Sequence, residues 1–439
     1  MRALHGRPNP SCREEVGSQA LAMRLFHRDA VTLFRPFTLD ALNFLLADVR
    51  GALGPYLNVF LITQEHWSQS AVGMVTTVSG LLSLVVQTPV GAAIDATRAK
   101  RALIVAALAL LAVGAVAIYA FPRFWPVLAA NTVIALVGDV FGPAVAALTL
   151  GLYKREALAR RLGRNSAFDH AGNVAIAAAA GGVGWLFSQR AVFLLVPVFA
   201  VLATVATLSI PGNAIDHDRA RGGDMPDDGG RAAGRGVLLT CRPLLVYAMC
   251  ALLFHFANAP LLPLVGQKLA SAHHDLATAM MSACIIAAQL IMLPIALAVG
   301  AYADRIGRKP ILLLGFGILP VRALLYTLSD NTAWLIGVQL LDGVGAGIFG
   351  AITPLVIADL MRGTGRFNVA QGAVATAQGV GASMSGLAAG VVVDRLGYAA
   401  AFVGAAVMAS VALAGLALAM PETASNGRDG RLAGDREIH

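Results

Sequence analysis

Charged residues are scarce in this chain of 439 residues: Asp, Glu, Lys and Arg together make up 13% of it, against 57% hydrophobic residues. The mean hydropathy of +0.70 is equally far from that of a soluble globular protein. Because a soluble core could not bury so large an apolar fraction, the composition predicts a membrane protein.

Cysteine is also rare, and the four cysteines show no CxxC spacing and fall in no loop that we expect to face outward. Neither a disulfide framework nor a zinc site is therefore predicted. The run His273-His274-Asp275 could touch a metal, but three adjacent residues do not form a closed coordination shell. The sequence contains no HExxH, nucleophile elbow or phosphate-binding loop. We expect no metal, no cofactor and no enzymatic activity.

What the chain does contain is long apolar runs separated by charged or turn-rich breaks. A helix of about 20 apolar residues spans the hydrocarbon layer of a bilayer. The first 36 residues hold no run of signal-peptide length, so the first apolar segment is expected to be an uncleaved insertion signal. The sequence predicts twelve spans, at approximately 38–63, 70–94, 101–121, 125–150, 166–188, 190–211, 243–266, 276–303, 310–328, 333–358, 369–393 and 398–420.

The two halves of the chain repeat each other. The run GAYADRIGRK at Gly300–Lys309 has a weaker copy, GAAIDATRAK, at Gly91–Lys100. Asp95 and Asp304 in these copies lie 209 positions apart, and the prolines that end the sixth and twelfth spans lie 210 apart. In each copy, a glycine expected to let two helices approach closely precedes the aspartate and a cluster of cations. A nearly constant offset indicates a duplicated six-helix unit.

This repeat divides the chain into five segments. The stretch between the halves is too polar and glycine-rich to bury anything and is expected to be a linker. We predict an N-terminal extension at 1–36, six-helix bundles at 37–211 and 243–421, a linker at 212–242 and a tail at 422–439.

Arg and Lys concentrate in the alternate loops that share a side with the N-terminus. By the positive-inside rule, both termini and the linker are expected in the cytoplasm. The net charge of +8 is therefore a membrane-orientation signal, and nucleic-acid binding is not expected.

The motif and the repeat resemble the major facilitator superfamily. Its signature loop, G-x-x-x-D-R-x-G-R-K, is filled by Gly300, Asp304, Arg305, Gly307, Arg308 and Lys309. The resemblance implies an all-α membrane protein of twelve transmembrane helices, arranged as two six-helix bundles with pseudo-two-fold symmetry. It also implies that these residues, with Gly91 and Asp95 of the first copy, form a conformational latch that stabilises one orientation of a carrier.

The match to other patterns of that family is partial. QLLDGVGAG in the tenth span resembles the fourth-helix pattern, with Gln339 and Asp342 in its arginine and glutamine positions. NVAIAAAAGG at Asn173–Gly182 follows the antiporter signature of the fifth helix but lacks its proline.

Ionisable side chains near the bilayer centre are costly unless they face a cavity or find a partner, so they are candidates for a substrate or proton pathway. Arg50, Asp139 and His255 each lie about 11 or 12 residues into a span, near the midplane. Arg50 and Asp139 are expected to form a charge pair facing the cavity, and the alternative for Arg50 is a purely structural salt bridge. His255 could exchange protons, and the alternative is a neutral histidine that makes a single hydrogen bond. The full set of candidates is Asn43, Asp48, Arg50, Asn58, Asp139, His255, Gln339 and Asp342.

The first and ninth spans carry further polar features. On the first span, a stripe within an arc of about 80° should face water or substrate. Arg322 of the ninth span is expected to be a structural partner, because ninth helices of this family tend to be peripheral. The stripe consists of Asp40, Asn43, Arg50, Gly54 and Asn58.

We therefore expect a secondary transporter of the cell's inner, or plasma, membrane that performs proton-linked efflux of a small organic molecule. Proton-coupled uptake of a small organic anion, which Arg50 would suit, is one alternative, and a transport-dead membrane sensor or assembly factor is another. The expected partners are the lipid bilayer, a small-molecule substrate and protons, and the chain is expected to be a monomer.

Overall fold

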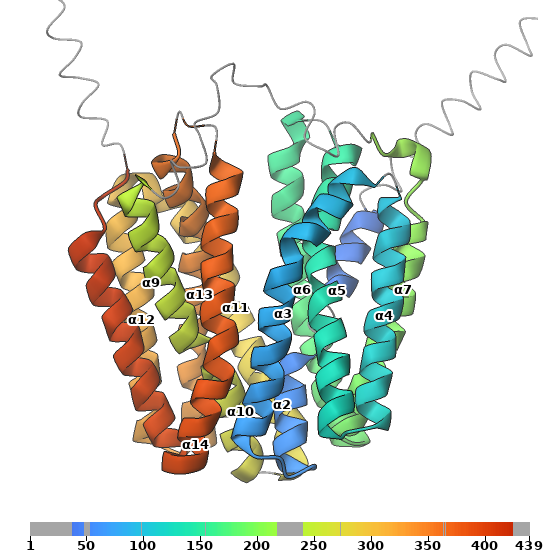
Figure 1. The fold of residues 1–439 in the computed structure, drawn as a ribbon, viewed down its shortest axis with the longest axis vertical. Coiled ribbons are helices and arrows are strands. Elements are labelled where there is room, and N and C mark those ends of the chain that lie inside the picture. The colour runs from blue at the N-terminus through green and yellow to red at the C-terminus, as the bar shows by residue number, and fades with distance from the viewer. Residues whose placement is uncertain are drawn as a thin grey trace, which may run out of the picture.

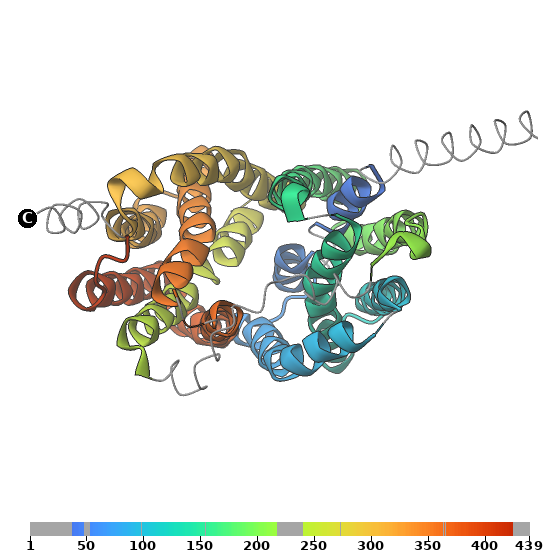
Figure 2. The same cartoon turned by 90° about the horizontal axis from the view of Figure 1, so that it is seen from above.

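The computed structural model describes residues 37–47, 53–97, 99–153, 155–216, 240–272, 274–362, 364 and 366–424. Over these ranges every regular element is helical (Figure 1). Viewed along the helices, the elements form two groups that lie side by side (Figure 2).

The first bundle comes from the first half of the chain. Its elements are the helix Phe37–Leu46, α2 (Gly54–Thr63), α3 (Gln69–Ala96), α4 (Lys100–Ala120), α5 (Phe124–Leu152), α6 (Arg155–Leu186), η2 (Arg190–Leu194), α7 (Leu195–Leu208) and η3 (Gly212–Ala214).

The second bundle repeats this order. Its elements are α9 (Arg242–Asn258), α10 (Leu261–Ala272), η5 (His274–Leu276), α11 (Ala277–Ile306), α12 (Arg308–Leu328), α13 (Thr332–Leu360) and α14 (Phe367–Ala419).

Nine helical stretches in the described part of the chain are long and apolar enough to cross a membrane. One of them, within α14, holds two spans, because its backbone leaves helical geometry at Gly397, where φ is 83°. Glycine suits this bend because a side chain is strained at positive φ. The first span is divided between Phe37–Leu46 and α2, and α6 begins with an arginine-rich stretch that lowers its hydropathy. With these included, the twelve predicted spans form the two predicted six-helix bundles.

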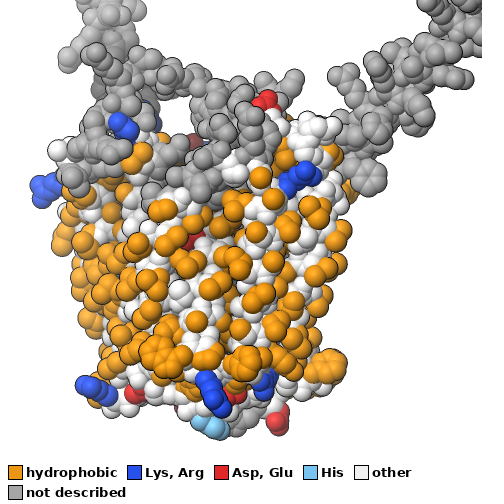
Figure 3. All heavy atoms as spheres, turned by 45° about the vertical axis from the view of Figure 1, so that its right-hand side comes forward, with side chains coloured by type: hydrophobic (Ala, Val, Ile, Leu, Met, Phe, Trp, Pro, Cys, Tyr) orange, Lys and Arg blue, Asp and Glu red, His pale blue; other side chains and the backbone are white. Residues whose placement is uncertain are grey.

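Apolar side chains cover the middle of the visible surface, while charged side chains gather towards its two ends (Figure 3). Large residues such as Val85, Phe187 and Leu418 are exposed in helices or at their ends. An exposed apolar belt of this kind matches a bilayer, in which no hydrophobic penalty attaches to such side chains.

The buried apolar side chains form two clusters, one centred on each bundle. In the first, Phe60 packs edge-on against Phe193 with ring centroids 5.5 Å apart. In the second, Phe254 stacks on Phe349 at 5.0 Å and also contacts Phe316 at 4.7 Å. The first cluster also extends across the boundary into the second bundle, where it takes in Ala277, Met281 and Ile285 of α11.

The described segments begin at residue 37, break after 216, resume at 240 and end at 424 at one end of the bundles, at the top of Figure 1. We call this end the linker side and the opposite end the distal side. The helices of the two bundles run close together near the distal side (Figure 1).

Candidate functional site

A carboxylate of the second bundle caps a helix of the first on the distal side. Asp394 of α14 accepts hydrogen bonds from the backbone N–H groups of Gln69, at 3.0 Å, and Ser70, at 2.8 Å, in the first turn of α3. The Gln69 side chain donates from Nε2 to the Tyr398 hydroxyl at 2.8 Å. The free N–H groups and the dipole of a helix N-terminus both favour such an anion.

From this cap towards the linker side, the backbones of α3 and α14 are in close contact. Thr77 donates to the Ser383 carbonyl at 2.6 Å and accepts from the Leu387 N–H at 3.1 Å. A Cβ atom on Gly73 would lie 2.3 Å from the Gly386 carbonyl oxygen, so only glycine permits this approach.

A second contact between the bundles joins α6 to α11. A Cβ atom on Gly184 would lie 2.0 Å from Thr278 Oγ1, and Tyr56 of α2 hydrogen-bonds Ser282 of α11 at 2.8 Å. Further towards the linker side, His170 Nδ1 lies 2.8 Å from Gln289 Oε1. The two contact zones hold the bundles together from the distal side inwards, so this conformation is closed at that end.

The glycines of the fifth and eleventh spans do not all serve this interface. Gly184 and Gly386 face the opposite bundle, whereas Gly182 has open space around a would-be Cβ atom. Gly381 packs on α9 within its own bundle, 2.1 Å from the Leu252 carbonyl. Sequence alone did not separate these classes.

A cavity of about 220 Å³ lies beneath the distal cap, between α2, α3, α10 and α14. Its polar lining consists of Asn58, Gln69, Thr76, Gln267 and Ser385. The amide oxygens Asn58 Oδ1 and Gln267 Oε1 are buried and have no hydrogen-bond partner among the described residues. The prediction that Asn58 lies on a substrate pathway is compatible with this position and stays a prediction.

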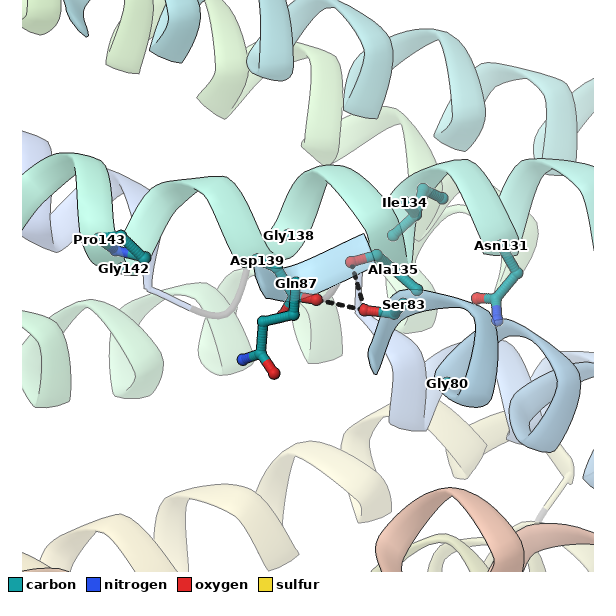
Figure 4. Close-up of a pocket in the computed structure, with 10 residues that line it drawn as sticks. All are labelled: Gly80, Ser83, Gln87, Asn131, Ile134, Ala135, Gly138, Asp139, Gly142 and Pro143. Atoms are coloured by element: carbon teal, nitrogen blue, oxygen red, sulfur yellow. Dashed lines mark hydrogen bonds between the residues drawn. The ribbon is translucent and has the colours of Figure 1, made fainter. Parts of the chain in front are cut away.

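A larger cavity, of about 560 Å³, lies between α3 and α5 (Figure 4). Asp139 lines it together with Gln87 and Asn131. Ser83 donates a short hydrogen bond to the Asp139 carboxylate and lies 3.2 Å from the Ala135 carbonyl. Asp139 is the one ionisable group among the described residues of this lining.

The predicted polar stripe of the first span does not act as a unit. Asp40, expected to face water or substrate, is instead buried and pairs with Arg161 at 2.5 Å and Arg164 at 2.6 Å on α6. That expectation is wrong for Asp40, because two cations near the start of α6 compensate its burial. Asn43 donates to the Leu39 carbonyl of its own helix at 2.7 Å.

Asp48 and Arg50 lie outside the described residues. The pairing of Arg50 with Asp139 therefore stays a prediction.

His255 sits among aromatic rings of the second bundle. Its Nδ1 lies 3.0 Å from the Ala251 carbonyl, and its ring meets Phe349 edge-on at 4.9 Å. This geometry matches the alternative of a singly hydrogen-bonded, structural histidine.

Gln339 and Asp342 belong to a buried network with Arg322. The Arg322 guanidinium pairs closely with Asp342 and donates to Asn258 Oδ1 at 2.8 Å, while Gln339 Nε2 donates to Asp342 at 2.9 Å. Tyr326 donates a short hydrogen bond to Gln339. The network ties α9, α12 and α13 together, as the structural interpretation of Arg322 predicts.

The signature loop at the linker side is anchored within the second bundle. Arg308 Nη1 lies 2.7 Å from Asp304, whose side chain is 85% exposed, and Arg308 Nε donates to the buried carboxylate of Asp359 at 3.0 Å. Arg305 is exposed. The role of the loop as a conformational latch stays a prediction.

Glu422, beyond the end of α14, caps the first turn of α12. It accepts from the backbone N–H groups of Arg308, at 2.8 Å, and Lys309, at 3.0 Å. Burial would raise the pKa of the Glu422 carboxyl, but its backbone donors outweigh burial and hold this pKa below its usual value. Gly307 has φ of 95°, and a Cβ atom there would lie 2.7 Å from the Glu422 carboxylate. Glycine is therefore required at this turn.

Of the two motif glycines expected to let helices approach closely, the structure tests Gly300. A Cβ atom on Gly300 would meet no atom within 4 Å, so the expected close helix approach there is wrong for this conformation. The side chain of Asp95 and the surroundings of Gly91 lie outside what the structure describes.

Several residues of these sites were missed by sequence reasoning. Asp394 and Gln267 stand at span ends, where polar residues are common, and His170 lies only a few residues inside its predicted span. The sequence offered one signal for such residues, an ionisable side chain within a predicted span, and of these three residues His170 alone shows it.

Comparison with known proteins agrees with this architecture. A family model described as Major Facilitator Superfamily matches residues 39–226 and 244–435. The uncharacterized MFS-type transporter Rv2456c of Mycobacterium tuberculosis (strain ATCC 25618 / H37Rv) is 48% identical over 387 residues, 88% of this chain and 93% of that protein. The uncharacterized MFS-type transporter MT2531 of strain CDC 1551 / Oshkosh gives the same values, 48% over 387 residues.

Solved structures share the fold at low sequence identity. A mutant of the nucleoside transporter NupG has a TM-score of 0.73 and 11% identity, covering 88% of this chain and 100% of that one. The D-xylose-proton symporter has a TM-score of 0.67 and 13% identity, covering 89% and 98%.

Proposed function

Because the chain belongs to the Major Facilitator Superfamily, we propose that it is a proton-linked secondary transporter that exports a small organic molecule by alternating access. The two bundles meet through the Asp394 cap on the distal side and through the contacts between α6 and α11. Breaking those contacts while closing the linker side would expose a central site to the other compartment.

The observation that carries proton coupling is Asp139. This carboxylate stands in a cavity whose other described lining residues are uncharged, and Ser83 holds it in place. An ionisable side chain within a membrane span is costly unless it faces a cavity or finds a partner, so such a residue is a candidate proton carrier. Arg50, outside the described residues, is proposed as its partner in one conformation.

The test is flux in inside-out vesicles under an imposed pH gradient, with an unbiased panel of metabolites and toxicants. Asp139→Asn should abolish gradient-driven accumulation while substrate exchange without a gradient continues. Gln87→Glu, which keeps a carboxylate in the same cavity, serves as a second-site variant for partial rescue of Asp139→Asn. Full gradient-driven transport by Asp139→Asn would contradict the role of this residue.

Proton symport in the uptake direction is the second candidate, since one structural neighbour is named a D-xylose-proton symporter. The two directions predict opposite signs of flux under the same gradient. A transport-dead sensor would give none, and would tolerate loss of Asp139.

The orientation and boundaries belong to the same proposal. We place the chain in the plasma membrane as a monomer, with both termini and the linker 212–242 in the cytoplasm between bundles at 37–211 and 243–421. A reporter near Gly229 should report the cytoplasmic side and one near Ser329 the outer side; finding both on one face would contradict this topology.

A further inference from the structure

We infer that the cavity beneath the distal cap binds an uncharged solute rich in hydroxyl or N–H donors, held by the amide oxygens of Asn58 and Gln267. This inference rests on the proposed transport function and specifies the substrate class. The cavity lies between the bundles, with walls from α2 and α3 on one side and α10 and α14 on the other. A solute there would touch both moving units.

The two amide oxygens carry the inference. Gln267 is 2% exposed, yet its Oε1 has no hydrogen-bond partner among the described residues, and the same holds for the buried Oδ1 of Asn58. A buried acceptor without a donor costs free energy, and native structures contain few of them. Neither oxygen is open to water in this conformation, but both residues line the cavity, so a rotation of each carboxamide would present its oxygen to a ligand that supplies the donors.

The hydroxyl groups of the lining are acceptors as well. Thr76 directs its hydroxyl to the Val72 and Gly73 carbonyls, and Ser385 donates to the Ala382 carbonyl at 2.7 Å. With their hydrogens engaged in their own helices, these oxygens can offer only lone pairs to the cavity.

The break between α9 and α10 adds to this character. Pro263 lacks an N–H group and cannot make the usual helical hydrogen bond to the carbonyl of Ala259, which also lines the cavity. Apart from the N–H groups of its carboxamides, the polar lining therefore offers acceptors to a ligand.

A charged ligand is disfavoured in this cavity. None of the described residues that line the cavity is ionisable, so neither an anion nor a cation would find a counter-charge. Burying an uncompensated charge is far costlier than burying a hydrogen-bonded neutral group. The volume of about 220 Å³ restricts the solute to a small one.

The contact between Asp394 and Gln69 closes the distal end of the cavity and links binding to the conformational change. Gln69 lines the cavity and also carries the backbone N–H that Asp394 caps. Opening the distal side by releasing this cap would expose the cavity to that compartment.

The test measures binding and flux separately on the purified full-length chain. D-xylose and uridine serve as uncharged donors, benzoate as an anion and tetraphenylphosphonium as a cation; binding is measured by thermal shift and flux by counterflow in proteoliposomes. At least one uncharged probe should bind, and Gln267→Met, which keeps the volume but removes the acceptor, should weaken that binding about tenfold. Asn58→Ala should weaken it similarly.

The matched control is Gln64→Met, the same change at an exposed glutamine of the distal side, which should leave binding unchanged. Preferential binding of benzoate or tetraphenylphosphonium, or equal binding by wild type and Gln267→Met, would overturn the assignment. Uncharged probes that bind in a Gln267-dependent manner without exchanging across the vesicle would instead contradict the transport function and uphold the site.

Discussion

The Asp394 carboxylate caps the first turn of α3 at Gln69 across the boundary between the bundles, 3.0 Å from the Gln69 backbone nitrogen. A cap normally comes from the residue that starts the helix, whereas this one comes from a helix more than 300 positions later in the sequence. The stability of the N-terminus of α3 is thereby coupled to the conformation of the carrier.

Asp394→Ala should therefore favour the form that is open on the distal side. Loss of a helix cap costs about 1 kcal/mol, equivalent to an approximately fivefold change in population. The readout is labelling of Ser385→Cys by an impermeant maleimide in a background without native cysteines. Asp394→Asn, which retains an acceptor oxygen, is the control and should label nearly as slowly as the wild type. Equal labelling of Asp394→Ala and wild type would show that the cap does not hold the seal.

Two alanine substitutions on α6 test whether its close contact with α11 is needed for transport. Gly184→Ala places a methyl group 2.0 Å from Thr278 Oγ1, while at Gly182 the same group meets no atom within 4 Å. Gly184→Ala should increase distal labelling and slow transport, whereas Gly182→Ala should change neither. If both variants behave alike, contact between α6 and α11 does not limit the cycle.

The Arg322–Asp342 pair is suited to a double-mutant cycle. Arg322→Met or Asp342→Leu alone leaves one charge in the network without its partner, at an expected cost of about 3–5 kcal/mol each, whereas the double variant removes both charges and should recover much of it. The measurement is the melting temperature in detergent. Strictly additive losses would mean that the two charges do not depend on each other.

At the signature loop, the two carboxylates that face Arg308 should contribute different amounts to stability. Asp304 is exposed, so Asp304→Asn should cost at most about 1 kcal/mol in stability. The Asp359 side chain is 9% exposed, and Asp359→Asn removes a charged hydrogen bond worth about 1.5–3 kcal/mol. Thermal unfolding compares the two, and a larger loss for Asp304→Asn would contradict this order. If the latch operates, Asp304→Asn should still redistribute the two conformations.

The stability that Glu422 contributes at the signature loop should depend on pH in a defined direction. Its pKa in the folded protein lies below the ordinary carboxyl value of 4.5, so its contribution to stability is fully present above pH 4.5 and is lost as the pH falls through the lowered pKa. The difference in melting temperature between wild type and Glu422→Gln should therefore be constant near neutral pH and shrink in acid. A difference that grows below pH 4.5 would reverse the sign.

The sequence by itself determined the membrane class, the twelve spans and the duplicated architecture. These features depend on the length and hydropathy of local segments, because a bilayer requires every spanning segment to satisfy its own backbone. The signature loop could also be recognised, because its residues are contiguous in the sequence, but its partners Asp359 and Glu422 could not.

Only the tertiary structure decided which polar residues meet. Asp394 and Gln69 are 325 positions apart, and Asn58 and Gln267 face one cavity from opposite halves of the chain. The depth of a residue in a span can be counted from the sequence, but its partner depends on how two bundles pack. For this reason His255, placed at the right depth for proton exchange, proved to lie among aromatic rings within its own bundle.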